Sequence, residues 1–185
     1  MYAKHYLDLD IPVSNENIGY DLFAGDWIEP YGNGLDTNII MNFSYEIHDK
    51  YNYQWKLNIE MNSENAGFVC MTNIFYHSVA KNAFIAPVSG YSNRIIYEIK
   101  YHNGKKDEID SSEPISDSFF FKIRNGTNNV NYGKLVNFEP HISKDGGYIN
   151  FTYYLNPTPN DRNLELNTKS NLFQNLDRGK KVSKP

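Results

Sequence analysis

The chain is 185 residues long, and its 18 basic and 22 acidic side chains give a formal net charge of −4. Aromatic residues make up 15% of the sequence and charged residues 22%, which is typical of a folded protein and excludes a disordered polyampholyte. The mildly acidic balance disfavours a protein whose main partner is nucleic acid. The length fits one domain, or one domain with a tail.

The single cysteine, Cys70, excludes an internal disulfide, so the fold must depend on its core. We expect Cys70 to be a small buried hydrophobic residue. No stretch of about 18 apolar residues occurs, and the N-terminus has no apolar run of signal-peptide length. These observations predict a soluble protein without a leader or a membrane span, which would reach the outside of a cell by lysis or by a leaderless route.

Apolar and polar residues alternate with a period of two in the first third of the chain, which predicts strands. A short strand is expected from His5 to Ile11, followed by longer ones over 38–49 and 53–61. The segment from Ile18 to Trp27 fits one or two helical turns, but two glycines weaken that pattern, so a loop fits it equally well.

The middle of the chain continues the strand pattern. Residues 63–67 are expected to form a hairpin loop that joins the strand over 53–61 to a strand over 68–76. Shorter strands are predicted over 83–87 and 118–123. A strand over 95–101 ends at Asn103-Gly104, a pair that tolerates positive φ and is a strong turn signal.

The last third begins with a further hairpin and ends in a polar segment. Residues 136–138 and 149–155 flank a glycine-rich turn over 143–147. After the prolines near position 157, three apolar residues recur at helical spacing and Gly179 is placed as a C-cap. The apolar residues are Leu172, Phe173 and Leu176, and the basic end consists of Arg178, Lys180, Lys181 and Lys184. This pattern predicts a short amphipathic helix or a solvated tail.

Eight or nine short strands with one apolar face each require a second sheet to cover that face. We therefore predict an all-β fold, an antiparallel two-sheet β-sandwich, with a short helix or two. The sandwich domain is expected over residues 1–156, and residues 157–185 are expected to form an extended or partly helical polar tail.

Catalytic motifs are missing from the sequence. It contains no metalloprotease helix motif, no serine nucleophile elbow, no phosphate-binding glycine loop and no cysteine–histidine cluster with zinc spacing. The five histidines are scattered, and carboxylates on the predicted strands fit solvent-facing positions. We predict a protein that is not an enzyme and has no cofactor and no metal.

The 15 tyrosines exceed what a small core usually holds, so some are expected at the surface. Exposed tyrosines stack on sugars, enclose quaternary ammonium groups or anchor proteins at membrane interfaces. The candidates are Tyr91, Tyr97, Tyr101, Tyr153 and Tyr154. The alternative for each of them is core packing or cross-strand pairing.

The segment from Gly67 to Lys106 resembles the middle of the actinoporins, which are pore-forming cytolysins, and the related fungal fruit-body lectins. The residues that carry the resemblance are Gly67-Phe68-Val69-Cys70, Ile74-Phe75-Tyr76, Phe84-Ile85-Ala86-Pro87, Tyr91-Ser92-Asn93 and 97–106. Further on, Asn131-Tyr132-Gly133 and the hairpin to Leu155 look like the last two strands of that family.

The resemblance implies a sandwich fold and a phosphocholine-type headgroup site at Pro87, Tyr91 and the aromatic pair Phe119 and Phe120. The chain departs from the family at Ile85, where a serine is expected, and at both phenylalanines, where tyrosines are expected. The long N-terminal amphipathic helix of the family has no counterpart in residues 1–12, which alternate like a strand.

The function expected from these features is recognition of a surface without catalysis. The protein would dock on membrane lipid headgroups and self-associate as a cytolytic, pore-forming toxin. One alternative is a lectin that binds glycans, and another is a self-assembling structural subunit of a particle, coat or inclusion. The candidate binding residues are Pro87, Tyr91, Tyr97, Tyr101, Phe119 and Phe120. The expected partners are lipid headgroups or glycans and further copies of the chain, with no nucleic acid.

Overall fold

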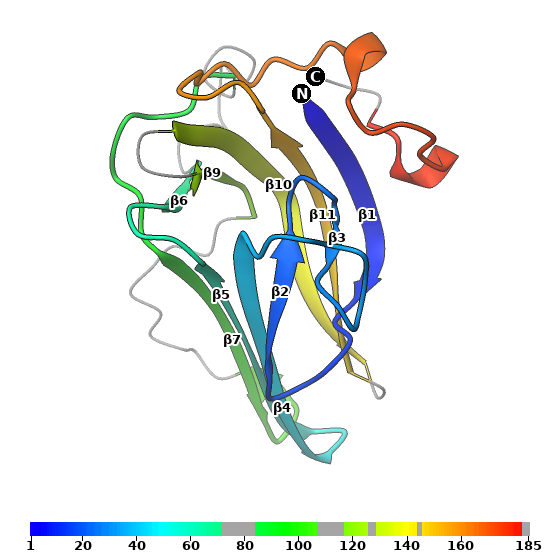
Figure 1. The fold of residues 1–185 in the computed structure, drawn as a ribbon. Helices are drawn as coiled ribbons and strands as arrows, with labels where there is room; N and C mark the ends of the chain where they lie inside the picture. Colours follow the sequence, from blue (N-terminus) through cyan, green and yellow to red (C-terminus); the bar gives the residue numbers. More distant parts are fainter. Residues whose placement is uncertain (72–83, 107–116, 126–128, 144–145, 183–185) are drawn as a thin grey trace, which may run out of the picture.

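The computed structural model describes residues 1–71, 84–106, 117–125, 129–143 and 146–182. These residues form two antiparallel sheets that face one another, so the predicted all-β sandwich is confirmed (Figure 1). In the five-stranded sheet the order is β1 (Tyr2–Asp10), β11 (Gly146–Leu155), β10 (Asn129–Ser143), β9 (Phe119–Asn125) and β6 (Gly67–Cys70). In the six-stranded sheet it is β3 (Asp26–Trp27), β2 (Asn17–Asp21), β4 (Ile39–Asp49), β5 (Asn52–Met61), β7 (Arg94–His102) and β8 (Lys105–Lys106).

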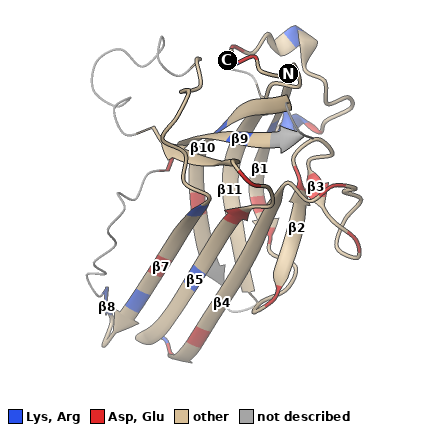
Figure 2. Cartoon of the chain, turned by 60° about the vertical axis from the view of Figure 1, so that its left-hand side comes forward, with Lys and Arg blue, Asp and Glu red and all other residues tan. Residues whose placement is uncertain are grey.

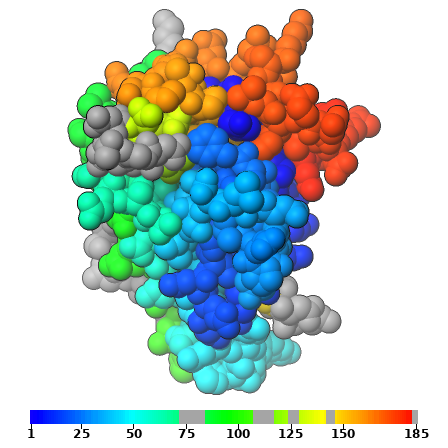
Figure 3. Space-filling view, in the orientation of Figure 1, coloured from blue at the N-terminus to red at the C-terminus, as the bar shows by residue number. Residues whose placement is uncertain are grey.

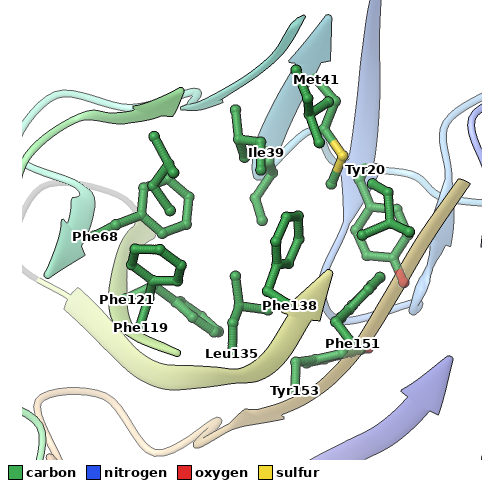
Figure 4. Close-up of a cluster of buried hydrophobic side chains, with 14 of the residues drawn as sticks. Tyr20, Ile39, Met41, Phe68, Phe119, Phe121, Leu135, Phe138, Phe151 and Tyr153 are labelled. Atoms are coloured by element: carbon green, nitrogen blue, oxygen red, sulfur yellow. The ribbon is translucent and has the colours of Figure 1, made fainter. Parts of the chain in front are cut away.

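The core lies between the sheets and is rich in aromatic rings (Figure 4). The alternation predicted for 39–47 is confirmed at its start, because Ile39, Met41 and Phe43 are buried. Glycine makes room for the rings at one close contact: a Cβ on Gly147 would lie 2.7 Å from the ring of Phe43. Toward the other end of β4 the cover is lost, and Ile47 is 48% exposed.

The hairpin predicted over 63–67 is wrong, although Asn65 does adopt the positive φ of a turn residue. After β5 the chain crosses to the other sheet, where β6 pairs with β9 and exchanges two backbone hydrogen bonds with Ser92. A period of two fixes which side chains face the core but does not identify the partner strand. Residues 72–76 of that predicted strand lie outside the described residues.

The segment from Ile18 to Trp27 forms strands at both ends and a turn over 22–25, so helical turns or a loop over its whole length are wrong. Residues of β2 pair with β4, because Ile18 and Tyr20 alternate inward, and a short turn leads to β3. Asp21 organises this turn through the backbone N–H groups of Phe23 and Ala24, which donate to its carboxylate at 2.8 and 3.0 Å.

The other predicted strands have mixed outcomes. The strands expected at His5–Ile11, 95–101 and 118–123 are present as β1, β7 and β9, and the turn at Asn103-Gly104 joins β7 to β8. The hairpin of 136–155 is present as β10 and β11. The strand expected over 83–87 is reduced, within the described residues, to one bridge between Ile85 and Asn163.

The C-terminal segment packs on the outer face of the five-stranded sheet, where Leu164 and Leu166 are buried. The helix predicted around Leu172 is wrong: two short 3₁₀ turns, η1 (Thr168–Ser170) and η2 (Arg178–Lys180), flank an extended stretch. The reason is that Asn171 exchanges hydrogen bonds of 3.1 and 2.7 Å with the backbone of Ala3 and so binds this stretch to β1. Figure 3 shows these C-terminal residues, in orange and red, seated against the N-terminal ones in blue.

Candidate functional site

Pro87 and Tyr91 lie together in the loop that precedes β7, and both are half-buried. The Tyr91 hydroxyl donates to the Pro87 carbonyl oxygen at 2.9 Å. The ammonium of Lys122 lies 4.8 Å from the centre of the Tyr91 ring, and burial raises the pKa of the phenol. The ring face that a choline group would use is therefore already in contact with a cation of the protein itself.

Phe119, Phe120 and Tyr97 are 3%, 6% and 8% exposed, so the expectation that they form part of a surface site is corrected. Phe119 and Tyr97 belong to the main core, where Tyr97 stacks on Phe138. Phe120 faces the other side of its sheet and packs under Leu164 of the C-terminal segment. In this structure none of the three presents a ring to an external ligand.

Tyr153 and Tyr154 are also buried, at 0% and 5% exposure, so the alternative of core packing is confirmed for them and a surface position is not. Tyr101 is half-buried and lies at the far end of β7 from Tyr91. A strand of nine residues spans about 27 Å, so these two tyrosines cannot share one small ligand. The predicted residues thus divide into one loop site, one strand-end site and the core.

The strand-end site is the place where the six-stranded sheet extends past the core, and we call it the tip. It consists of the turns between β4 and β5 and between β7 and β8 with the adjoining strand ends, and Figure 1 shows it at the lower end of the molecule. The two turns are joined by hydrogen bonds from Gly104 N to Tyr51 O, at 2.9 Å, and from Asn103 N to Asn52 Oδ1, at 3.0 Å. The tip is therefore one surface and not two separate loops.

Aromatic and aliphatic side chains are exposed at the tip. Tyr51 is 52% and Ile47 is 48% exposed, and Tyr53 stacks on Tyr101 with ring centres 4.6 Å apart. The ammonium of Lys50 lies 4.6 Å from the centre of the Tyr51 ring. Rings that are apolar at one end and wet at the other suit the boundary between water and a membrane.

Lysines surround these rings. Figure 2 shows basic residues, in blue, at the end of β7 and at β8. The lysines of the tip are Lys50, Lys100, Lys105 and Lys106, and all four are exposed. The acid of the turn, Asp49, accepts from Asn52 Nδ2, Tyr51 N and Asn52 N, and these bonds hold its pKa below the usual value. Asp107 and Glu108 follow Lys106 in the sequence, outside the described residues.

A second exposed apolar surface, the loop patch, surrounds the site expected at Pro87 and Tyr91. It consists of Ile85, Pro87, Val88 and Tyr91, with Lys122 beside it. Ile85 is 49% and Val88 is 69% exposed. The loop patch carries fewer exposed rings than the tip, and its tyrosine is bonded inward to its own loop.

The outer face of the six-stranded sheet carries a shallow polar groove with a volume of about 160 Å³. It lies above Ser44, between longer side chains on β4, β5 and β7. The groove is lined by Asn15, Ser44, Tyr45, Glu46, Gln54, Trp55, Lys56 and Glu98. Gln54 Nε2 donates to Glu46 Oε2 at 2.9 Å, and Lys56 pairs with Glu98 at 3.5 Å. The volume is below the roughly 300–1,000 Å³ of common small-molecule pockets.

Lys134 is a buried cation that the sequence did not reveal. It is 3% exposed, and burial lowers its pKa to about 8. Its ammonium lies 4.3 Å from the ring centre of Tyr154 and 4.8 Å from that of Phe84. These contacts fix the segment around Phe84 on the outer face of the sheet, which is a structural role.

Sequence reasoning included Tyr101 among its candidates but missed the tip as a surface. Lys50 is far along the chain from Lys100, Lys105 and Lys106, and the pairing of β5 with β7 brings it beside them. A usable signal was present, because Lys50-Tyr51 and Asn103-Gly104-Lys105-Lys106 both fall in turns between strands that share a sheet.

No family model, no curated protein and no solved structure matches this chain. The resemblance to the actinoporins and the fungal lectins therefore stays a prediction. Within the described part of the chain, no helix has the length and apolar character needed to cross a membrane.

Proposed function

We propose that this protein is a non-enzymatic surface-recognition protein that docks on lipid headgroups through its tip. The observation that carries the proposal is that exposed Tyr51 and Ile47 lie with four exposed lysines on two turns that are hydrogen-bonded to one another. The rings enter the interfacial region, and the lysines contact the phosphates of anionic lipids. The formal net charge of the whole chain is −4, so the positive charge of the tip is local.

The proposal extends to cytolysis, in which docked molecules associate and permeabilise the membrane. Associated copies contact the membrane at several tips at once and therefore bind it more tightly than a single copy does. We therefore expect self-association to accompany docking. Release of a trapped dye separates docking with lysis from docking alone.

The test is co-sedimentation of the purified protein with vesicles of phosphatidylcholine alone, with added phosphatidylserine and with added sphingomyelin. We expect binding to the phosphatidylserine vesicles that weakens as salt is added, because the lysine contribution is screened. Each lysine near an anionic surface contributes about 1 kcal/mol, so Lys105→Ser with Lys106→Ser should weaken binding by roughly 30-fold at low salt.

Two further variants decide where the docking surface lies. Leu35→Ser removes an exposed apolar side chain, 89% exposed, from another loop and serves as the matched control for Tyr51→Ser. Val88→Ser with Tyr91→Ala removes the loop patch. Loss of binding in the loop-patch variant but not in the tip variants would place docking at the predicted Pro87–Tyr91 site. Absence of binding to every vesicle would overturn the proposal.

Glycan binding is the second candidate function, and the polar groove above Ser44 favours it. Glu46 and Gln54 present an acceptor and a donor side by side, as adjacent hydroxyls of a sugar require. The groove's small volume suits one sugar ring and not an oligosaccharide.

A glycan array with the wild type and the Gln54→Ala variant tests the second candidate. We expect hits that Gln54→Ala removes and that free sugar blocks, while vesicle binding is unchanged. An array without hits, or hits that Gln54→Ala leaves in place, would rule the groove out as a glycan site.

A further inference from the structure

The outer edge of β7 is the starting point of the inference. Met61 N donates to Asn93 O at 3.0 Å, and 61 pairs with 93 in the continued register of β5 and β7. In an antiparallel ladder the odd-numbered residues of β7 therefore direct their backbone groups toward β5, and the even-numbered residues direct theirs away. Among the described residues, β8 pairs with this outer edge only at Tyr101 and His102.

Two other edge strands are bonded at single positions of their outer sides in the described part of the chain. Asn171 binds β1 at Ala3, and Ser92 exchanges backbone hydrogen bonds with Phe68 of β6. Ser92 Oγ donates to Arg94 O at 3.4 Å, and between Ile96 and Lys100 the outer edge of β7 has no hydrogen-bonded strand among the described residues. An open sheet edge is a template for another strand.

We propose that a second copy of this chain pairs with β7 edge to edge, in an antiparallel register centred on Ile96. The even-numbered residues then form hydrogen-bonded pairs across the two-fold axis: Ile96 faces its own copy, and Arg94 faces Glu98 of the second copy. The two six-stranded sheets become one continuous sheet. This inference does not depend on docking of the tip.

Charge selects this register over the next two along the strand. Centring on Tyr97 would place Arg94 opposite Lys100, and centring on Glu98 would place two carboxylates opposite one another. Like charges directly opposite are destabilising, whereas the register centred on Ile96 makes two Arg94–Glu98 pairs. It also places the side chain of Ile96, which is 41% exposed, against an identical apolar partner.

Charged residues of β5, on the outer face of the six-stranded sheet, continue the alternation of opposite charges. Glu60 lies opposite Arg94 in the ladder of β5 and β7, and Lys56 lies opposite Glu98, to which it is bonded at 3.5 Å. Across the proposed interface the row reads Glu60, Arg94, Glu98 of the second copy and Lys56 of the second copy, so its charges alternate in sign. Such an alternating row fits a paired edge.

The test is analytical ultracentrifugation of the wild type, of Arg94→Glu, of Glu98→Arg and of the double charge swap. We expect a concentration-dependent dimer that each single reversal weakens roughly tenfold or more, because two opposite-charge pairs become like-charge pairs. The double swap restores opposite charges in both pairs and should restore the dimer. Glu46→Arg, an equal change of charge on the same face away from the edge, is the matched control and should leave the dimer intact.

Cross-linking gives an independent measurement of the register. In a Cys70→Ser background, Ile96→Cys places two thiols opposite one another, and we expect a covalent dimer on mild oxidation, whereas His48→Cys at the tip should give none. A protein that is monomeric at every concentration would overturn the proposal. A dimer that both single reversals leave unchanged, or that the double swap does not restore, would overturn it as well.

Discussion

The tyrosines of the core and those of the tip use the same side chain in opposite ways. In the core, Tyr20 donates to the Tyr6 hydroxyl at 2.7 Å, Tyr6 donates to Gly25 O, and Tyr153 donates to Leu22 O at 3.0 Å. At the tip, Tyr51 is 52% exposed beneath a lysine. A count of tyrosines therefore does not predict surface chemistry, because a core with enough internal acceptors can bury many of them.

The largest effect on stability is expected from Tyr153→Ala, which tests the role of the buried tyrosines. Tyr153 is fully buried and its ring contacts Tyr6, Phe151 and Phe173, so the change leaves a cavity and an unpaired Leu22 carbonyl. We expect a loss of about 3–5 kcal/mol in the free energy of unfolding. Urea unfolding measures it, and a loss below about 1 kcal/mol would contradict the packing described.

A smaller loss of stability is expected from Asp21→Asn, which changes a buried carboxylate. The exposed carboxylate with which we compare it is Asp49 at the tip. Burial alone would raise the pKa of Asp21, but N–H groups of Ala24, Leu35, Asp36 and Phe23 donate to it and hold the pKa below its usual value. Replacing one acceptor oxygen by an amide should cost about 1–3 kcal/mol near neutral pH.

The pH dependence of this loss follows from the sign of the shift. A carboxyl whose folded pKa is depressed contributes its stability above the unfolded pKa of about 3.9, and the contribution fades as the pH falls through the folded pKa. The gap in urea midpoint between the wild type and Asp21→Asn should therefore be smaller at pH 3 than at pH 6. An equal gap at both values would count against the depressed pKa. Asp49→Asn is the matched change at the tip and should cost less.

The smallest effect on stability is expected at the tip itself. Tyr51→Ser removes an exposed ring, so the free energy of unfolding should stay within about 0.5 kcal/mol of the wild type. The same variant should bind vesicles less well than Leu35→Ser does. If Tyr51→Ser instead unfolded the protein, the tip would have to be counted as part of the core.

The sequence allowed the fold class and most inward faces to be predicted, because an apolar residue at every second position is enough to define a half-buried strand. Strand partners were less accessible. Phe68 and Cys70 alternate as expected, yet they join the opposite sheet, since the choice depends on contacts with Ser92 and β9 that no local pattern encodes.

The same limit explains the outcome at the candidate site. Phe119 and Phe120 point to opposite sides of one strand and are both buried, because the C-terminal segment covers the face that would otherwise be exposed. Leu172 and Phe173 have helical spacing, but the hydrogen bonds of Asn171 to Ala3 keep their segment extended. Contacts between distant parts of the chain decided each of these cases.

The position of the tip also determines where a second protein can be fused to the chain without blocking the tip. Met1 and the C-terminal segment meet at the opposite end of the sandwich, where Leu172 N donates to Met1 O at 2.9 Å (Figure 1). The 11 residues of β4 alone extend for roughly 33 Å. A fluorescent protein fused to Met1 would therefore be held on the far side of the sandwich from any surface that the tip contacts, and it would report attachment without obstructing it.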